Sequence, residues 1–306
     1  MLFAPDDFVK ITNIDGKNRD FQFIEGLNTD VIEFDENNEC GPGGLYFCRF
    51  KDIEKWVDYY GNILLWNVEI PKNAKMVEYT DKLKADSIIL SNPIRAYEDE
   101  EIAKILVSVN GLSIKYVENQ TEEICKIAIR QNGYAIGYIK EPTEEIYKIA
   151  ATQNGYCIKQ IQNPTYEICK LAVKTTPSAL YYVPEQTEEL CKLAVENDGT
   201  IIRLVKNQTL ELCKIAIEQN PSSLQYIRNQ TNELCKMAII KDSWCLIYVK
   251  RQTPELCKLA VSIDGNTISC VREQTPQLCE IAINQNRLSL RHIREKTDEL
   301  LDMAKI

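Results

Sequence analysis

The sequence is poor in histidine, because His292 is the only one among 306 residues. A single histidine provides no histidine pair for a metal site and lacks a partner with which to form a catalytic triad. No run of about 18 apolar residues occurs, so we expect no segment that spans a bilayer. The N-terminus reaches Asp6 and Asp7 before any apolar stretch builds up, so we expect no signal peptide.

The rest of the composition, 44% apolar and 26% charged, is typical of a globular protein. Twelve cysteines without an export signal favour a reducing compartment. The charge is uneven: residues 1–98 hold 11 Lys and Arg against 18 Asp and Glu (net −7), whereas residues 99–306 hold 25 against 27 (net −2). We predict two domains, 1–96 and 97–306.

From Asp99 onward the sequence repeats every 22 residues without an insertion. Each later unit begins with a threonine. These residues are Thr121, Thr143, Thr165, Thr187, Thr209, Thr231, Thr253, Thr275 and Thr297. Nine units therefore cover 99–296, and the truncated stretch 297–306 is expected to form a capping helix. Positions are numbered below from the first residue of each unit.

Each unit predicts two short helices, called helix A and helix B. Threonine at position 1 is an N-cap for helix A, and apolar residues at positions 4, 5, 7, 8 and 9 form a wide apolar arc. Position 12 is a second capping residue, as in Asn132, and Gly or Pro often follows at the start of helix B, which is expected from about position 13 to 19. Helices this short are marginal alone, so stacking predicts a right-handed α-solenoid.

Residues 1–96 lack the repeat. Alternating and β-branched patterns predict strands at 8–12, 20–25, 44–50, 63–70 and 87–90, and a helix at 51–60. The expected fold of this part is a small α+β domain.

Two stretches resemble known families. The unit Thr-x-Glu-Leu-Cys-Lys-Leu-Ala-Val, with Gly or Pro at position 13 and Ile-x-x-Val at 16–19, resembles a short helical repeat of unknown function that is abundant in giant viruses of the mimivirus group. Residues 44–48 and 65–71 are similar to a small domain that precedes repeat arrays in giant-virus and some phage proteins. The resemblance implies a viral protein acting in the host cytoplasm, the virus factory or the virion, and implies no known activity.

A column of cysteines occupies position 5. Its members are Cys125, Cys169, Cys191, Cys213, Cys235, Cys257 and Cys279. Stacked helices are about 10 Å apart, whereas a disulfide needs Cα atoms within about 7 Å, so we interpret the column as core packing rather than as disulfides or metal ligands. Cys40 and Cys48 flank Gly-Pro-Gly-Gly, which we interpret as a tight turn. Glu at position 3 and Lys at position 6 are expected to pair along each helix A on a solvated face.

The candidate binding surface lies on helix B, where positions 14 and 18 carry aromatic residues and positions 17 and 20 carry basic ones. The residues singled out are Tyr138, Tyr182, Tyr226, Trp244, Tyr248, Arg203, Arg228, Lys250, Arg272 and Arg294. An aromatic column beside a basic column is typical of a protein-binding groove or a track for single-stranded nucleic acid. The competing interpretation is that the tyrosines bridge adjacent units and the basic groups balance the glutamates.

These patterns predict a non-enzymatic scaffold that binds a protein partner through the solenoid surface. The alternative is binding of single-stranded RNA along the Tyr, Lys and Arg positions, which the net charge of −2 on the array disfavours. An enzyme within 1–96 ranks third, because no acid–base or metal constellation is recognisable there. The sequence indicates no cofactor, no metal and no small-molecule substrate.

Overall fold

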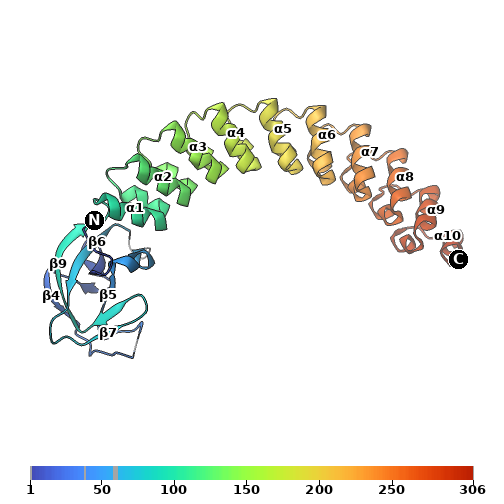
Figure 1. Cartoon of the computed structure of the whole chain (residues 1–306). Helices are drawn as coiled ribbons and strands as arrows, with labels where there is room; N and C mark the ends of the chain where they lie inside the picture. The colour runs from blue at the N-terminus through green and yellow to red at the C-terminus, as the bar shows by residue number, and fades with distance from the viewer. Residues whose placement is uncertain (1, 38, 58–60, 306) are drawn as a thin grey trace. The chain divides into compact units, whose positions relative to one another are not determined.

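The computed structural model describes residues 2–37, 39–57 and 61–305. By internal contacts the chain divides into two compact units, Met1–Gln160 and Ile161–Ile306. The first unit contains a β-sheet region and three repeats, and the second contains the remaining repeats (Figure 1). The boundary proposed at 96/97 falls between the last strand and the first repeat helix, inside the first of these units.

The N-terminal region is built on a seven-stranded antiparallel sheet with the strand order β4-β9-β6-β1-β5-β8-β7. Its strands are β1 (Phe8–Asn13), β4 (Gly26–Thr29), β5 (Leu45–Arg49), β6 (Ile63–Glu69), β7 (Met76–Glu78), β8 (Leu83–Ala85) and β9 (Ser87–Arg95). A separate hairpin pairs β2 (Lys17–Asn18) with β3 (Phe21–Gln22). The core under the sheet includes Phe47, Trp66 and Ile88.

Four of the five expected strands are confirmed as β1, β5, β6 and β9. The strand expected at 20–25 is reduced to the two residues of β3, and the short strands β2, β4, β7 and β8 were missed. The helix expected at 51–60 is wrong in type, since η1 (Phe50–Lys55) is a 3₁₀ helix; residues 58–60 of that prediction lie outside the described residues. Segments this short carry too few residues to establish a hydrophobic period.

The predicted repeat is confirmed from the first unit onward: a sheet region is followed by an α-solenoid of 22-residue two-helix units. The helices A are α1 (Glu100–Val109), α2 (Glu122–Gln131), α3 (Glu144–Gln153), α4 (Tyr166–Thr175), α5 (Glu188–Asn197), α6 (Leu210–Gln219), α7 (Asn232–Lys241), α8 (Pro254–Ile263), α9 (Pro276–Gln285) and α10 (Asp298–Lys305). Figure 1 shows them as successive ribbons, α1 to α3 in the first unit and α4 to α10 in the second.

Helix B is a six-residue 3₁₀ helix at positions 13–18 of each unit. The helices B are η3 (Gly111–Tyr116), η4 (Gly133–Tyr138), η5 (Gly155–Gln160), η6 (Pro177–Tyr182), η7 (Gly199–Leu204), η8 (Pro221–Tyr226), η9 (Ser243–Tyr248), η10 (Gly265–Cys270) and η11 (Arg287–His292). The capping residue at position 12 was correctly identified. In the unit that begins at Thr121, Asn132 has extended backbone angles, its N–H donates to the Ala128 carbonyl that ends α2, and its side chain accepts the N–H of Tyr134 at 3.0 Å. One residue therefore ends helix A and begins helix B.

The expected positions of the repeat are buried, and one further position is buried as well. In the unit around α7, Leu234, Cys235 and Ala238 of helix A and Leu246 of helix B are at most 3% exposed. Position 15 is also buried and was not anticipated, because it carries residues of mixed polarity that are small in most units, with Ile201 as an exception. Buried examples are Ala135, Cys157, Ala179, Ser223, Cys245, Thr267 and Ser289. A small residue at this position lets helix B approach its neighbours closely.

A glutamine at position 22 ties one unit to the next. The Nε2 of Gln230 donates to the Leu224 carbonyl of its own unit at 2.8 Å and to the Tyr248 carbonyl of the following unit at 3.0 Å. Its Oε1 accepts the backbone N–H of Lys250 at 2.8 Å. The same three bonds are made by Gln120, Gln186, Gln208, Gln252 and Gln274. These bonds satisfy backbone groups that a six-residue helix leaves without an internal partner.

Two units carry proline at position 22 instead of glutamine. These are Pro142, in the unit that begins at Thr121, and Pro164, in the unit that begins at Thr143. Proline has no side-chain amide and therefore cannot make the three bonds of the position-22 glutamine.

Lysine side chains enter the interior of the sheet region. Lys10 of β1 is 3% exposed, its Nζ donates to the Tyr46 carbonyl at 2.7 Å, and the same atom lies 4.5 Å from the centroid of the Phe23 ring. Burial lowers the pKa of the Lys10 ammonium from 10.5 to about 7. Lys84 of β8 is fully buried, and its Nζ donates to the Asp35 carbonyl at 2.8 Å.

We expect Gln230→Ala to lower the free energy of unfolding by about 1–3 kcal/mol, because it removes three hydrogen bonds to backbone groups of two units. Urea unfolding of the full chain, followed by circular dichroism, measures the effect. The matched control is Asn229→Ala at the adjacent exposed position, for which we expect a change of no more than about 0.5 kcal/mol. Equal effects of the two substitutions would contradict the role of the glutamine.

Lys10 makes stability depend on pH. Between about pH 7 and 10.5 the unfolded chain binds a proton at Lys10 that the folded chain does not, so this residue makes stability rise with pH. We expect the stability of the natural chain relative to Lys10→Met to increase by about 1.4 kcal/mol per pH unit between pH 7 and 9. Urea midpoints measured for both chains across this range test it, and parallel curves would show that Lys10 keeps its charge on folding.

Candidate partner-binding surface on the second helices

The structure places the aromatic candidates at the ends and on the outer side of helix B. Tyr138 is 47% exposed and Trp244 is 43% exposed, while Tyr182 and Tyr248 are each 36% exposed. Tyr226 is half-buried. Helix B therefore presents large rings to solvent in several units, although each ring also contacts protein along one side.

Some of these contacts cross from one unit to the next. The guanidinium carbon of Arg203, at position 17, lies 5.8 Å from the ring centroid of Tyr226 in the following unit. Likewise, the Nζ of Lys115, also at position 17, lies 5.9 Å from the ring centroid of Tyr138 in the following unit. The indole Nε1–H of Trp244 donates to Asp264 Oδ2 of the next unit at 3.1 Å. The tyrosine and tryptophan rings thus bridge units and remain partly open to solvent.

The basic residues at position 20 bind backbone of the preceding unit. Arg228 donates from Nη1 to the Lys206 carbonyl at 2.8 Å and from Nη2 to the Val205 carbonyl at 3.1 Å. Equivalent pairs of bonds are made by Lys250, Arg272 and Arg294. A cation at the C-terminal end of a helix satisfies free carbonyls and interacts favourably with the helix dipole.

Four of the ten candidate residues, those at position 20, therefore have donors committed to the array itself, and their side chains remain exposed. Sequence reasoning missed this role. The sequence did contain one indication of it: position 20 lies just beyond the end of helix B. From there a basic side chain can reach the carbonyls at the end of helix B in the preceding unit.

The Glu and Lys columns of helix A pair differently from the expectation. Lys104 and Glu101 form the expected pair three residues apart at 3.0 Å. Other pairs instead join position 6 to position 3 of the next unit, as in Lys214 with Glu233 at 2.7 Å and Lys170 with Glu189 at 3.0 Å. Stacking places consecutive helices A side by side, so a lysine reaches the neighbouring glutamate as readily as one on its own helix.

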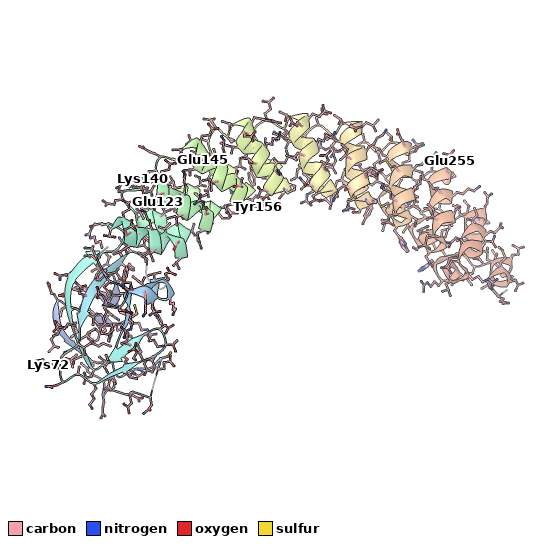
Figure 2. The ribbon with its side chains drawn as sticks, viewed as in Figure 1. Lys72, Glu123, Lys140, Glu145, Tyr156 and Glu255 are labelled. Carbon is pink, nitrogen blue, oxygen red and sulfur yellow. The ribbon has the colours of Figure 1, made fainter. Side chains whose placement is uncertain are left out.

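Figure 2 places these charged side chains relative to helix B. It labels Glu145 of helix A and Tyr156 of helix B at opposite edges of the ribbon of the same unit. In that unit the exposed glutamate of helix A and the tyrosine of helix B therefore lie on different edges of the ribbon. Exposed ion pairs of this kind contribute little to stability.

The position-5 cysteines are 3–5% exposed, and all twelve cysteines of the chain are free thiols. Burial raises the pKa of the column thiols, for example in Cys213 and Cys235. They behave as small apolar core residues, as expected. Within 2–37, 39–57 and 61–305, no three His, Cys, Asp or Glu side chains gather in a way that could hold a metal ion.

The loop before β5 has the conformation expected of a tight turn. Gly43 and Gly44 have φ angles of +86° and +140°, a region that side chains rarely adopt. In the part of the chain that the structure describes, no helix is long and apolar enough to cross a membrane.

The stacked two-helix units with bonded junctions define a helical-repeat protein, and comparisons place it among known chains. Residues 99–142 match a family model described as Domain of unknown function (DUF4116). The chain is 35% identical over 118 residues to the uncharacterized protein R869 of Acanthamoeba polyphaga mimivirus, an alignment that covers 37% of this chain and 83% of that protein. It is 32% identical over 108 residues to the putative ankyrin repeat protein R868 of the same virus.

The chain therefore belongs to the family of the mimivirus protein R869, and it is a giant-virus repeat protein with a small domain ahead of its repeats. This confirms the resemblance drawn from the repeat residues. The alignment with R868 covers 33% of this chain and 52% of R868, about half of that relative. No solved structure matches the chain.

We expect Arg228→Glu to lower the free energy of unfolding by about 1 kcal/mol, because two charge-assisted bonds to carbonyls of the preceding unit are lost. Arg251→Glu is the matched control, since it changes charge equally at the neighbouring exposed position 21. Urea unfolding of both variants tests the difference. If both variants are as stable as the natural chain, the bonds at position 20 contribute nothing and charge reversal there is a clean probe of binding.

Proposed function

We propose that this protein is a non-enzymatic scaffold that binds a protein partner along the helix B surface. The observation that carries the proposal is the row of partly exposed aromatic rings, which includes Tyr138, Trp244 and Tyr248. Tyr and Trp held rigidly by their neighbours are the residues that most often dominate binding energy at protein interfaces. Stacked repeats provide an extended surface on which several such rings act together.

The contacts of the basic residues favour a protein over RNA. A nucleic-acid track needs cations that are available to phosphates, whereas Arg228, Arg272 and Arg294 already donate to backbone carbonyls. The array carries a net charge of −2, so no basic excess attracts a polyanion. RNA binding along the same ridge remains the alternative outcome of the experiment below.

The family relation supports the same proposal. R868 is described as a putative ankyrin repeat protein, and ankyrin repeats are stacked units that use extended binding surfaces. We place the action of this protein in the host cytoplasm, the virus factory or the virion, in keeping with relatives from Acanthamoeba polyphaga mimivirus. We also propose that residues 1–96 form a functional module distinct from the repeats 97–306.

The test captures partners with the full chain, identifies them by mass spectrometry, and measures the dissociation constant of each purified partner. We expect Trp244→Ala combined with Tyr248→Ala to weaken binding at least tenfold, because two anchoring rings are removed from one helix B. Tyr166→Ala is the matched control, since Tyr166 is 42% exposed on helix A and should leave binding unchanged.

The salt dependence of the binding affinity distinguishes a protein partner from an RNA partner. A protein held by aromatic rings should bind with little dependence on salt, whereas an RNA should lose affinity steeply as salt rises. The affinity for a single-stranded RNA is measured by fluorescence anisotropy at about 50 and about 200 mM salt, a range over which binding through phosphate contacts weakens strongly. Binding of RNA but of no protein, with loss on Arg203→Ala, would overturn the protein proposal in favour of the RNA alternative.

A further inference from the structure

The N-terminal sheet region contains a cleft that the scaffold function does not use. Its volume is about 680 Å³, which lies in the range of sites for small ligands. Its walls come from β1, the β2–β3 hairpin, the loop at 40–44 and β5, with Trp56 and Lys82 completing the lining. Every lining residue precedes residue 83, so the cleft belongs to the sheet region and is separate from the helix B surface.

Two cationic side chains, Lys82 and Arg19, line this cleft. Lys82 is 8% exposed, and Arg19 lies exposed in the hairpin turn between β2 and β3, where its φ angle is +52°. Lys10 also lines the cleft, but burial lowers the pKa of its ammonium to about 7 and so reduces its charge near neutral pH. Lys82 and Arg19 both lower the pKa of the Tyr46 phenol, which burial raises. A cation largely removed from water, such as Lys82, favours a bound anion.

Two carboxylates, Asp20 and Asp30, also line the cleft, and the Oδ2 of Asp30 accepts the backbone N–H of Gly44 at 2.6 Å. The Nζ of Lys82 donates to the Cys40 sulfur at 3.1 Å and lies 3.6 Å from Glu39, whose side chain is 57% exposed. Because the ion pair with Glu39 is open to solvent, an entering anion can compete with it for Lys82.

Aromatic rings stand beside the cations. The Nζ of Lys82 lies 5.5 Å from the centroid of the Trp56 ring and 5.8 Å from that of Tyr46. Phe21 of the hairpin also lines the cleft and is half-buried. Flat rings next to a buried cation suit a ligand that combines an aromatic ring with negative charge.

The rim of the cleft is held in place by its own bonds. The Tyr46 hydroxyl donates to the Gly41 carbonyl at 2.6 Å, and Lys84 donates to the Pro42 carbonyl at 3.3 Å. Gly44 packs directly on the side chain of Lys84, where a Cβ would lie only 2.7 Å from the lysine chain. A rim fixed in this way reduces the entropy that a ligand must lose on binding.

We propose that this cleft binds a nucleoside di- or triphosphate. The base packs against Phe21, Tyr46 and Trp56, and the phosphates lie between Arg19 and Lys82. A nucleotide is favoured over an acidic peptide because the aromatic and cationic groups share one cleft sized for a single small molecule.

The experiment is isothermal titration calorimetry of the full chain with ADP, ATP, GTP and UTP, and with inorganic pyrophosphate and adenosine as the two halves of the ligand. We expect at least one nucleotide to bind at least tenfold more tightly than pyrophosphate or adenosine. Absence of binding by all four nucleotides overturns the proposal. Equal binding of pyrophosphate would show that the rings take no part, which also overturns it.

Variants locate the binding. We expect Arg19→Ala and Lys82→Met each to weaken the nucleotide at least tenfold, while Lys72→Met, an exposed lysine of the same region outside the lining, leaves it unchanged (Figure 2). Arg19 lies exposed in a hairpin turn, so its variant tests the cleft even where Lys82→Met disturbs folding. Nucleotide binding that both Arg19→Ala and a folded Lys82→Met leave unchanged lies elsewhere and overturns the assignment.

Discussion

The array depends on one constraint: a 3₁₀ helix of six residues cannot satisfy the backbone groups at its own ends. The adjacent unit satisfies them instead. Gln230 bonds to carbonyls at the ends of two successive helices B and to the N–H that follows the second, and Arg228 bonds to the end of the helix before it. Such bonds require the neighbour to be in register, because an insertion between the two units would move the side chain away from its carbonyls.

The same constraint shapes the surface that is left for binding. Because basic side chains at position 20 bond to the preceding unit, the partly exposed rings at positions 14 and 18 are the groups that a partner can contact from the solvent side. Arg203 and Tyr226 show how the two roles combine, since a cation from one unit packs on the ring of the next and holds it in one orientation. Rings ordered in this way lose little entropy when a partner binds.

The periodic features could be predicted from the sequence, and the cross-unit contacts could not. Thr at position 1 and Asn or Asp at position 12 act on backbone only two or three residues away, so their roles are visible in a single unit. The partner of Gln230 lies 18 residues ahead, in Tyr248, and no local pattern marks it. In the sheet region the sequence predicted the strand β1 but not the burial of Lys10, because β1 is covered on both sides and Lys10 is 3% exposed.

The hydrogen bonds between neighbouring units are not the same at every junction of the array. The two prolines, Pro142 and Pro164, remove the glutamine tie from two consecutive junctions, and the division of the chain by contacts falls between them, at Gln160 and Ile161. In a linear array the stability of any stretch is set by its nearest-neighbour interfaces. We therefore expect the two junctions at 143–164 to be weaker than those that carry the glutamine, so that unfolding of one segment is less tightly coupled to unfolding of the other.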